Sequence, residues 1–323
     1  MPDVLIPAAL IPALPPTTDV AWLFPGQGAQ HVGMGRDLYD QVPAARAVFD
    51  AADEALGFPL SELCFEGPEE ELTRTVNTQP ALVTHAIASL VAAIQCGSVT
   101  QRAAYLAGHS LGEYAALIAA GAISFADGLR LVRERGRLMQ ETCDAQPGTM
   151  AVVLGMERWL VAILCEQHGA SLCNENAPGN ITIGGTIQAV EATSEAARTA
   201  GATRVLPINV AGAFHTPLMQ SAADGMRAVL AATHFADPIV PVVSNVTSRV
   251  LTRGADIAQE LAEQVTSPVL WLDGVRTMVS AGVTNFIEFG PGRVLTGQLK
   301  RSERGASVRN VGTAAEARGE ATE

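Results

Sequence analysis

The segment Ala103-Ala-Tyr-Leu-Ala-Gly-His-Ser-Leu-Gly-Glu113 is the most informative about the fold, because it joins a short apolar strand to a helix through a serine between two glycines. Its first five residues predict the strand, and the residues after Gly112 predict the helix. Gly108 and Gly112 carry no β-carbon to crowd a sharp turn, so the Ser110 hydroxyl projects beside the N–H groups of the helix start. This context favours a nucleophile elbow over the alternative, a plain turn serine.

Strand and helix patterns alternate on both sides of this segment. Apolar runs predict strands at residues 20–24, 239–244 and 286–289. Amphipathic runs predict helices at residues 42–56, 80–94, 126–140 and 257–265. Such alternation places parallel strands in one sheet with helices on its faces. The predicted fold class is therefore α/β, with an α/β-hydrolase-like core around a short parallel sheet.

Residues 146–210 interrupt this pattern with shorter elements. Apolar runs and helical segments follow one another there in the order βαββαβ, at residues 150–154, 159–168, 170–173, 181–183, 189–200 and 204–208. That order predicts an inserted ferredoxin-like small subdomain at 146–210. The large subdomain then comprises residues 20–145 and 211–301. A proline-rich leader at 1–19 precedes it, and residues 302–323 are expected to form a polar tail that is frayed from residue 314.

The charge balance excludes several classes of partner. The 323 residues include 21 basic and 33 acidic side chains, for a formal net charge of −12, and 48% of the residues are apolar. Such a chain folds, and it has no basic stripe for a nucleic-acid groove. Lys300 is the single lysine and Arg301 follows it, so the sequence has no phosphate-binding loop ending in Gly-Lys-Ser/Thr.

The cysteines and the apolar runs indicate a cytoplasmic protein that holds no metal. The five cysteines are an odd number without Cys-x-x-Cys spacing, so we expect reduced thiols and no zinc site. The leader has five prolines and no basic run before its apolar residues, unlike a secretory signal. The uncharged helix at 81–94 contains His85 and is shorter than the about 20 residues that a bilayer requires. No membrane span is therefore expected.

A serine nucleophile needs a base, and His215 is the best placed of the six histidines. It lies in the loop Gly212-Ala-Phe-His-Thr-Pro217, whose proline prevents continuation into a helix. The other histidines lie in helical or polar loop settings that are typical of surface or satisfied core residues. Among them, His109 adjoins Ser110 in sequence and is expected to point away from it. His215 is therefore the predicted general base.

Arg135 lies on the apolar face of its helix. The other arginines of this helix share a solvated face, whereas the residues three and four positions from Arg135 are Leu131, Val132, Leu138 and Met139. An unpaired buried cation is costly, so an anion must face this guanidinium. The anion is either an Asp or Glu of the protein or a carboxylate of the substrate, which arginine can bind through two hydrogen bonds.

Six motifs follow one another along the chain. They are Phe24-Pro-Gly-Gln-Gly-Ala-Gln30, Gly108-His-Ser-Leu-Gly-Glu113, Arg135-Gly-Arg-Leu-Met-Gln140, Gly212-Ala-Phe-His215, Gln264-Val-Thr-Ser-Pro-Val-Leu-Trp271 and Phe289-Gly-Pro-Gly292. Together they resemble the malonyl-CoA:acyl carrier protein transacylases, a family that includes the acyltransferase domains of polyketide synthases. The resemblance covers about residues 20–301. It implies an enzyme that moves a malonyl group from malonyl-CoA to the phosphopantetheine thiol of an acyl carrier protein.

The resemblance also implies a role for the residues of the reacting centre. Ser110 would be the acylated nucleophile and His215 its base, oriented by the main-chain carbonyl of Gln264. The main-chain N–H groups of Gln27 and Leu111 would form the oxyanion hole. A ping-pong cycle of this kind needs no metal and no redox cofactor.

The resemblance further implies how the acyl group is chosen. Arg135 would bind the free carboxylate of the malonyl group, and Phe214 and His109 would complete the substrate-binding set. Phe214 before the histidine is similar to the malonyl-selective members, because its bulk would crowd an α-methyl group. One departure is Asn180, where many relatives carry Gln, and this leaves the small-subdomain side of the pocket less well defined.

The carrier protein would have to dock through a local basic patch, because the chain as a whole is acidic. The candidates are Arg293, Lys300, Arg301 and Arg304. The alternative is that these residues form a solvated terminal face. The resemblance implies a discrete monomeric enzyme, and it leaves open whether the carrier belongs to fatty-acid, polyketide or malonate-decarboxylating machinery. An enzyme acting in trans on a polyketide synthase fits the chain length.

Three other functions remain as alternatives to malonyl transfer. The first is a hydrolase that removes stalled acyl groups from carrier proteins, which would leave Arg135 without a carboxylate to hold. The second is a transacylase for a different extender unit. The third is a carrier-docking subunit without catalysis, against which the intact serine, histidine and oxyanion-loop residues argue.

Overall fold

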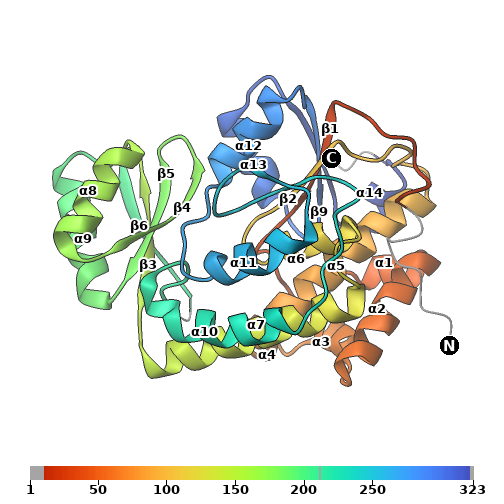
Figure 1. The fold of residues 1–323 in the computed structure, drawn as a ribbon, viewed down its shortest axis with the longest axis horizontal. Coiled ribbons are helices and arrows are strands. Elements are labelled where there is room, and N and C mark those ends of the chain that lie inside the picture. The colour runs from red at the N-terminus through yellow and green to blue at the C-terminus, as the bar shows by residue number, and fades with distance from the viewer. Residues whose placement is uncertain (1–10, 211, 321–323) are drawn as a thin grey trace.

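The computed structural model describes residues 11–210 and 212–320, which form a larger and a smaller lobe (Figure 1). The larger lobe contains a sheet in the order β10-β9-β1-β2-β7-β8. Its strands are β1 Val20–Phe24, β2 Tyr105–Gly108, β7 Val242–Val243, β8 Val250–Leu251, β9 Asn285–Phe289 and β10 Ser307–Val311. All neighbours pair in parallel except β8, which runs antiparallel to β7. The loops that follow the parallel strands therefore meet at one edge of the sheet.

Helices cover both faces of this sheet, so the chain has the predicted mixed α/β architecture. The helices of the larger lobe are α1 Arg36–Gln41, α2 Pro43–Leu56, α3 Leu60–Glu66, α4 Glu69–Thr73, α5 Thr75–Gln95, α6 Gly112–Ala119, α7 Phe125–Ala145, the short 3₁₀ turn η1 Pro217–Met219, α10 Gln220–Ala231, α11 Gly254–Gln264, α12 Trp271–Ser280, α13 Val294–Ser302 and α14 Ala314–Ala317.

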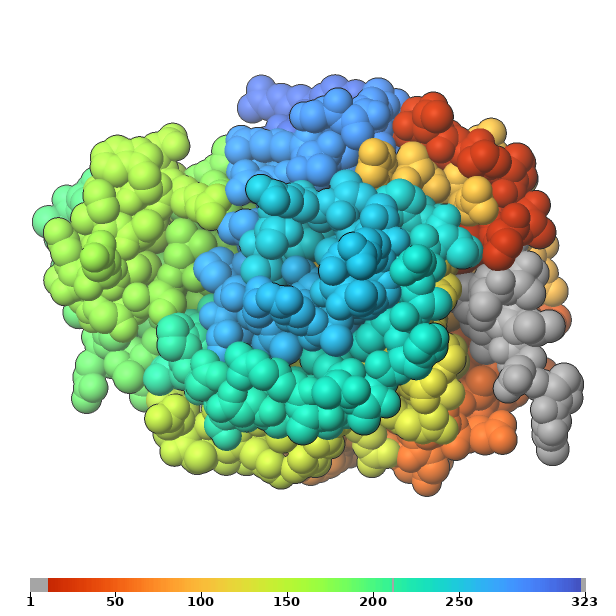
Figure 2. Space-filling view, viewed as in Figure 1, coloured from red at the N-terminus to blue at the C-terminus, as the bar shows by residue number. Residues whose placement is uncertain are grey.

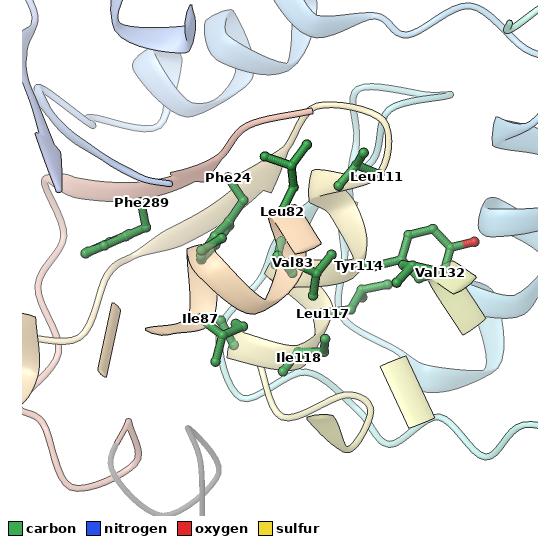
Figure 3. Packing of buried hydrophobic residues seen from close by; sticks show 14 of the residues in the cluster. Phe24, Leu82, Val83, Ile87, Leu111, Tyr114, Leu117, Ile118, Val132 and Phe289 are labelled. Carbon is green, nitrogen blue, oxygen red and sulfur yellow. The ribbon is translucent and has the colours of Figure 1, made fainter. Parts of the chain in front are cut away.

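The side chains of β1 point alternately to the two faces of the sheet, and they join a different buried core on each face. Trp22 and Phe24 join a core formed with helices α2, α5, α6 and α7, and Figure 3 shows Phe24 and Phe289 among its side chains, together with Leu82 and Ile87 of α5. Ala21 and Leu23 point to the opposite face and join a second core formed with α12 and α13. Successive side chains of a strand face opposite sides, so a central strand buried on both faces is apolar throughout.

The smaller lobe is built from residues 149–208 alone. Its antiparallel sheet has the order β4-β5-β3-β6, and helices α8 and α9 pack on it around a separate apolar core. The elements are β3 Thr149–Leu154, α8 Arg158–His168, β4 Ser171–Ala177, β5 Asn180–Gly185, α9 Ile187–Thr199 and β6 Arg204–Ile208. The predicted succession βαββαβ is therefore present. Figure 2 shows this lobe, in green, projecting from one end of the molecule.

Helix α5 begins earlier than the sequence predicts. A start at Pro80 was expected, because proline is favoured in the first turn of a helix, but the helix begins at Thr75 and Pro80 lies inside it. Tertiary packing explains the difference. Gly136 of α7 approaches this first turn so closely that a β-carbon there would lie 2.6 Å from the carbonyl oxygen of Thr75.

The prediction of a polar tail at 302–323, frayed from residue 314, is wrong for the residues up to 320. Residues 307–311 form β10, which pairs in parallel with β9, and the buried side chains of Val311, Ala314 and Ala317 pack into the main core. An edge strand keeps polar residues on its open side, so this segment resembles a tail in composition. Residues 1–10 of the predicted leader and 321–323 of the predicted tail lie outside the described residues.

Candidate active site

Ser110 lies on the turn between β2 and α6 in a strained backbone conformation. Its φ is +52°, a left-handed value that is uncommon for a residue with a side chain. The flanking glycines explain how this turn fits. A β-carbon at Gly108 would lie 1.9 Å from the carbonyl carbon of Gly112, and one at Gly112 would lie 2.2 Å from the carbonyl oxygen of Phe24. The sequence Gly-x-Ser-x-Gly is therefore required by close backbone packing.

Asn245 fixes this turn from the neighbouring strand. Its Oδ1 accepts a hydrogen bond of 2.7 Å from the Ser110 N–H, and its Nδ2 donates one of 2.7 Å to the Gly108 carbonyl. Asn245 follows β7 by two residues at the edge of the sheet where the strand ends meet. One side chain thus satisfies two main-chain groups of the turn, which holds the strained serine in place.

His215 is the hydrogen-bond partner of the serine. Its Nε2 lies 2.8 Å from Ser110 Oγ, and its Nδ1 lies 2.8 Å from the main-chain oxygen of Gln264. Because a carbonyl only accepts, we assign the proton to Nδ1, and this leaves Nε2 free to accept the serine proton. The imidazole is 4% exposed, and burial together with the nearby Arg135 charge lowers the pKa of His215 to about 3. The ring is therefore neutral, as a base must be.

Arg135 is buried beside the serine. Its Nη2 donates to Ser110 Oγ over 3.1 Å and to Gln264 Oε1 over 2.9 Å, and its Nη1 donates to Gln79 Oε1 over 2.9 Å. The side chain is 1% exposed, and none of the ion pairs within 11–210 and 212–320 includes it. Its hydrogen-bond acceptors in this part of the chain are neutral. The sequence-based alternative of a direct ion pair with an Asp or Glu is therefore not present there.

Glu113 is the acidic side chain that lies beside this cluster, one residue into α6. Burial is the largest effect on its carboxyl and raises the pKa of Glu113 well above its usual range. Its Oε2 accepts from Gln264 Nε2, which also donates to the Ser110 carbonyl over 3.0 Å. A carboxyl whose pKa is raised in this way is a poor counter-ion, so the positive charge of Arg135 is left for another anion.

The loop after β1 brings Gln27 towards the serine turn. A β-carbon at Gly26 would lie 2.7 Å from the carbonyl oxygen of His109, so the loop and the turn are in close contact. Across the described residues, the main-chain N–H groups of Gln27 and Leu111 donate no hydrogen bond. Leu111 directly follows Ser110 at the start of α6. Both groups are thus available to a ligand.

The remaining predicted substrate residues, His109 and Phe214, directly precede Ser110 and His215 in the sequence. The ring of His109 makes a hydrogen bond of 2.9 Å from Nε2 to Oδ1 of Asn176 on β4, and it lies 5.6 Å from the ring of Trp271. Phe214 is 8% exposed and packs into the main core directly before His215. Asn180 begins β5, and its buried Oδ1 has no hydrogen-bond partner within the described part of the chain.

Comparisons with known proteins agree with this arrangement. The family model described as "Acyl transferase domain" matches residues 21–319. The malonyl CoA-acyl carrier protein transacylase of Bacillus subtilis strain 168 is 47% identical over 290 residues, which cover 88% of this chain and 90% of the relative.

The chain belongs to the acyltransferase family.

Two solved structures are also similar to this acyltransferase. The acyl-carrier-protein S-malonyltransferase of Bartonella henselae superposes with a TM-score of 0.89 at 38% identity, covering 93% of this chain and 98% of that one. A malonyl-transacylase in complex with its type II polyketide synthase acyl-carrier protein superposes with a TM-score of 0.88 at 38% identity, covering 93% and 97%.

The predicted docking residues of the acyltransferase lie on α13 and directly before and after it. Lys300 and Arg301 occupy its last turn, Arg304 follows, and Arg293 precedes its first residue. All four are exposed or partly exposed. The Arg293 guanidinium forms an ion pair of 2.9 Å with Glu316 of α14. These basic side chains therefore share one region of the surface at the end of the chain.

Other predicted features of the acyltransferase concern metals, thiols and membranes. The five cysteines are free thiols, four of them buried and Cys96 exposed. Within residues 11–210 and 212–320, no group of three or more His, Cys, Asp or Glu side chains could hold a metal ion. No helix in this part of the chain is long and apolar enough to cross a membrane.

Sequence reasoning missed three side chains of the site: Gln79, Asn245 and the role of Glu113. Gln79 lies just before Pro80, where the sequence predicts no helix. The sequence therefore offers no reason to place Gln79 in the first turns of α5 beside Arg135. The position of Asn245 in the sequence could have identified it as a site residue. It comes shortly after a short apolar strand, and polar residues at the carboxyl ends of parallel strands collect at the binding edge of a sheet.

Proposed function

We propose that the protein is a malonyl-CoA:acyl carrier protein transacylase. The observation that carries this function is the buried Arg135, whose Nη2 lies 3.1 Å from Ser110 Oγ and whose hydrogen-bond acceptors among residues 11–210 and 212–320 are all neutral. An acyl group on Ser110 that ends in a carboxylate would supply the missing anion. The names of the relatives, including one solved with its carrier protein, support the same donor and acceptor.

The first half of the reaction transfers the malonyl group to Ser110. The serine proton moves from Oγ to His215 Nε2 as Oγ bonds to the thioester carbon. The main-chain N–H groups of Gln27 and Leu111 stabilise the resulting oxyanion, each typically by about 3 kcal/mol. Collapse of the intermediate breaks the carbon–sulfur bond, and His215 returns its proton to the departing coenzyme A sulfur.

The second half repeats these steps with the phosphopantetheine thiol of the carrier. The thiol gives its proton to His215, its sulfur bonds to the ester carbon, and Ser110 Oγ leaves with the proton. Arg135 holds the malonyl carboxylate through both halves, so the acyl group keeps its orientation while the thiol partners exchange. The cycle balances without a metal or a redox cofactor.

The choice of malonyl over a branched extender unit rests on Phe214. Its bulky, buried side chain directly precedes the base and would crowd an α-methyl group. A hydrolase that removes simple acyl chains would have no use for Arg135. Because one chain carries Ser110, His215 and Arg135 together, we propose that the enzyme works as a monomer, in the cytoplasm, where its free thiols stay reduced.

The architecture supports a finer classification of the two lobes. We assign residues 20–145 and 211–301 to an α/β-hydrolase-like large subdomain, to which β10 adds a strand, and residues 146–210 to a ferredoxin-like small subdomain. The parallel strand order with a serine turn after β2 supports the first assignment. The antiparallel order β4-β5-β3-β6 with two crossover helices supports the second. The exposed residues Arg293, Lys300 and Arg301 are proposed to contact the carrier.

Intact-mass measurement of the acyl-enzyme tests the proposed function. Malonyl-CoA should add one malonyl group to the wild-type chain and none to Ser110→Ala, and a holo carrier protein should then remove it as malonyl-carrier. Acetyl-CoA should label the enzyme far less. Release of free malonate without malonyl-carrier would identify a hydrolase instead, and the absence of any acyl-enzyme would identify a non-catalytic docking subunit.

A further inference from the structure

The two lobes are joined at a narrow neck. The chain enters the small lobe through residues 146–148, leaves it after Ile208, and is back in the larger lobe by Ala213. These crossings lie together, because a β-carbon at Gly148 would be 2.9 Å from the β-carbon of Ala213. A neck of two adjacent crossings permits rotation of one lobe against the other. Contacts away from the neck must therefore set the closed position.

A main-chain bridge supplies one such contact. Val269, between α11 and α12, donates from its N–H to the Cys173 carbonyl over 2.8 Å and accepts from the Glu175 N–H over 3.3 Å. These bonds extend the small sheet across the lobe boundary at β4. Figure 1 shows β4 facing the side of the larger lobe that carries α12 and α13.

An ion-pair cluster lies beside this bridge. Arg158 Nη1, at the start of α8, lies 2.8 Å from Asp273 Oδ2 of α12 and 3.2 Å from Glu175 Oε2 of β4. Arg276 lies 3.6 Å from Asp273 on the large-lobe side. The Glu175 side chain is 10% exposed, and its burial raises the pKa of this carboxyl while Arg158 opposes the rise. Arg158 thus forms ion pairs with an acidic side chain of each lobe. Because Glu175 is largely buried, this cluster is more than an exposed surface ion pair.

The strand that this cluster holds also contacts the reacting centre. Asn176 directly follows Glu175 and makes the 2.9 Å hydrogen bond to His109, the neighbour of Ser110. On the other side, Val269 lies five residues after Gln264, whose carbonyl orients His215. The position of the small lobe is therefore coupled to both sides of the serine.

We propose that Arg158, with Glu175 and Asp273, is a latch that holds the small lobe closed on the serine turn. Arg158 is a positioning residue, because it acts through β4 and Asn176. Its consequence for turnover rests on the proposed function. Opening the latch leaves Ser110, His215 and Arg135 in the large lobe intact, so chemistry at saturation persists while fewer molecules are competent to bind the thioester.

Amide hydrogen exchange and steady-state kinetics on two variants test the latch. Arg158→Gln removes the shared cation, and Asp273→Asn removes the large-lobe acid while Arg158 and Glu175 stay paired. Arg198→Gln is the control, because its pair with Glu195 lies within α9 of the small lobe. Each latch variant should speed exchange of the Val269 and Glu175 amides and raise KM for malonyl-CoA about fivefold, with kcat changed less than about twofold.

The outcomes separate the latch from a merely structural role. The KM for the truncated thioester malonyl-N-acetylcysteamine should rise less than that for malonyl-CoA, because its short arm contacts less of the small lobe. Arg158→Lys keeps the positive charge, so its KM for malonyl-CoA should lie close to the wild-type value. Unchanged exchange and KM in both variants, an equal effect of Arg198→Gln, or an effect of Arg158→Gln alone would overturn the latch. If the wild-type enzyme transferred no malonyl group, the proposed function would fail, and the exchange data would still decide the latch.

Discussion

At the residue scale, Gln264 connects the parts of the centre. Its main-chain oxygen accepts from His215, its Oε1 accepts from Arg135, and its Nε2 donates to the Ser110 carbonyl. The base, the cation and the serine turn are therefore held by one residue. Such a preorganised set needs little rearrangement when substrate arrives, which is how a fixed site lowers a reaction barrier.

Asn245 is the residue that the serine geometry depends on most directly. In Asn245→Ala the Ser110 N–H and the Gly108 carbonyl lose their partner, so the serine hydroxyl leaves its place against His215. We expect kcat/KM for malonyl transfer to fall about 100-fold, since misplacement by about 1 Å costs this much. Single-turnover acylation measures it. Asn285→Ala, at the amino end of β9, is the control and should keep near-wild-type acylation; an active Asn245→Ala would refute this role.

The buried histidines should make the fold sensitive to acid. Burial lowers the pKa of His85 from 6.5 to about 3, so between these values the unfolded chain binds a proton that the folded chain does not. The free energy of unfolding therefore falls as pH falls from 6.5 towards 3, by about 2 kcal/mol for this residue at pH 5. His85→Gln should lose less Tm than the wild type between pH 7.5 and pH 5.

The comparison needs a control, because other buried groups also titrate. His168→Gln, at an exposed histidine, should lose as much Tm between pH 7.5 and pH 5 as the wild type does. A loss in His85→Gln as large as that of the wild type would show that His85 does not contribute to the acid sensitivity.

At the element scale, the turn between β2 and α6 is determined by backbone packing. Its glycines allow β1, β2 and α6 to approach within distances that no β-carbon tolerates, and this approach forces Ser110 into its positive φ. The sequence predicted this element well because Gly-x-Ser-x-Gly leaves few conformations. It predicted α5 and β10 poorly, because contacts distant in sequence, from Gly136 to Thr75 and from β9 to β10, decide where those elements begin.

Two glycine substitutions separate close packing from helix propensity. Gly112→Ala would place a β-carbon 2.2 Å from the Phe24 oxygen, so Tm and acylation should both fall strongly. Gly297→Ala, inside α13, would meet nothing within 4 Å and should stabilise the fold by about 0.5–1 kcal/mol. Differential scanning calorimetry measures both changes. Equal effects of the two substitutions would contradict the packing account.

At the scale of the whole molecule, the fold brings residues from distant parts of the chain to one edge of a parallel sheet. Ser110 comes from the turn after β2, Asn245 from the segment after β7, and Arg135 from α7, which packs against α5 and thus against Gln79. The sequence indicated Ser110, His215 and Arg135 through their motifs and settings. It could not indicate that Arg135 is held by two side-chain amides besides the serine hydroxyl, because only the packing of α5, α7 and α11 decides this.

The role of Arg135 is measured by the ratio of the acylation rate constants of Ser110 with malonyl-CoA and with acetyl-CoA, in wild type and in Arg135→Ala. Because Arg135 should bind only the acyl group that ends in a carboxylate, we predict that the substitution lowers this ratio by about 100-fold, equivalent to about 3 kcal/mol of lost carboxylate binding. A ratio that is the same in both proteins would contradict the assignment of Arg135 to the malonyl carboxylate.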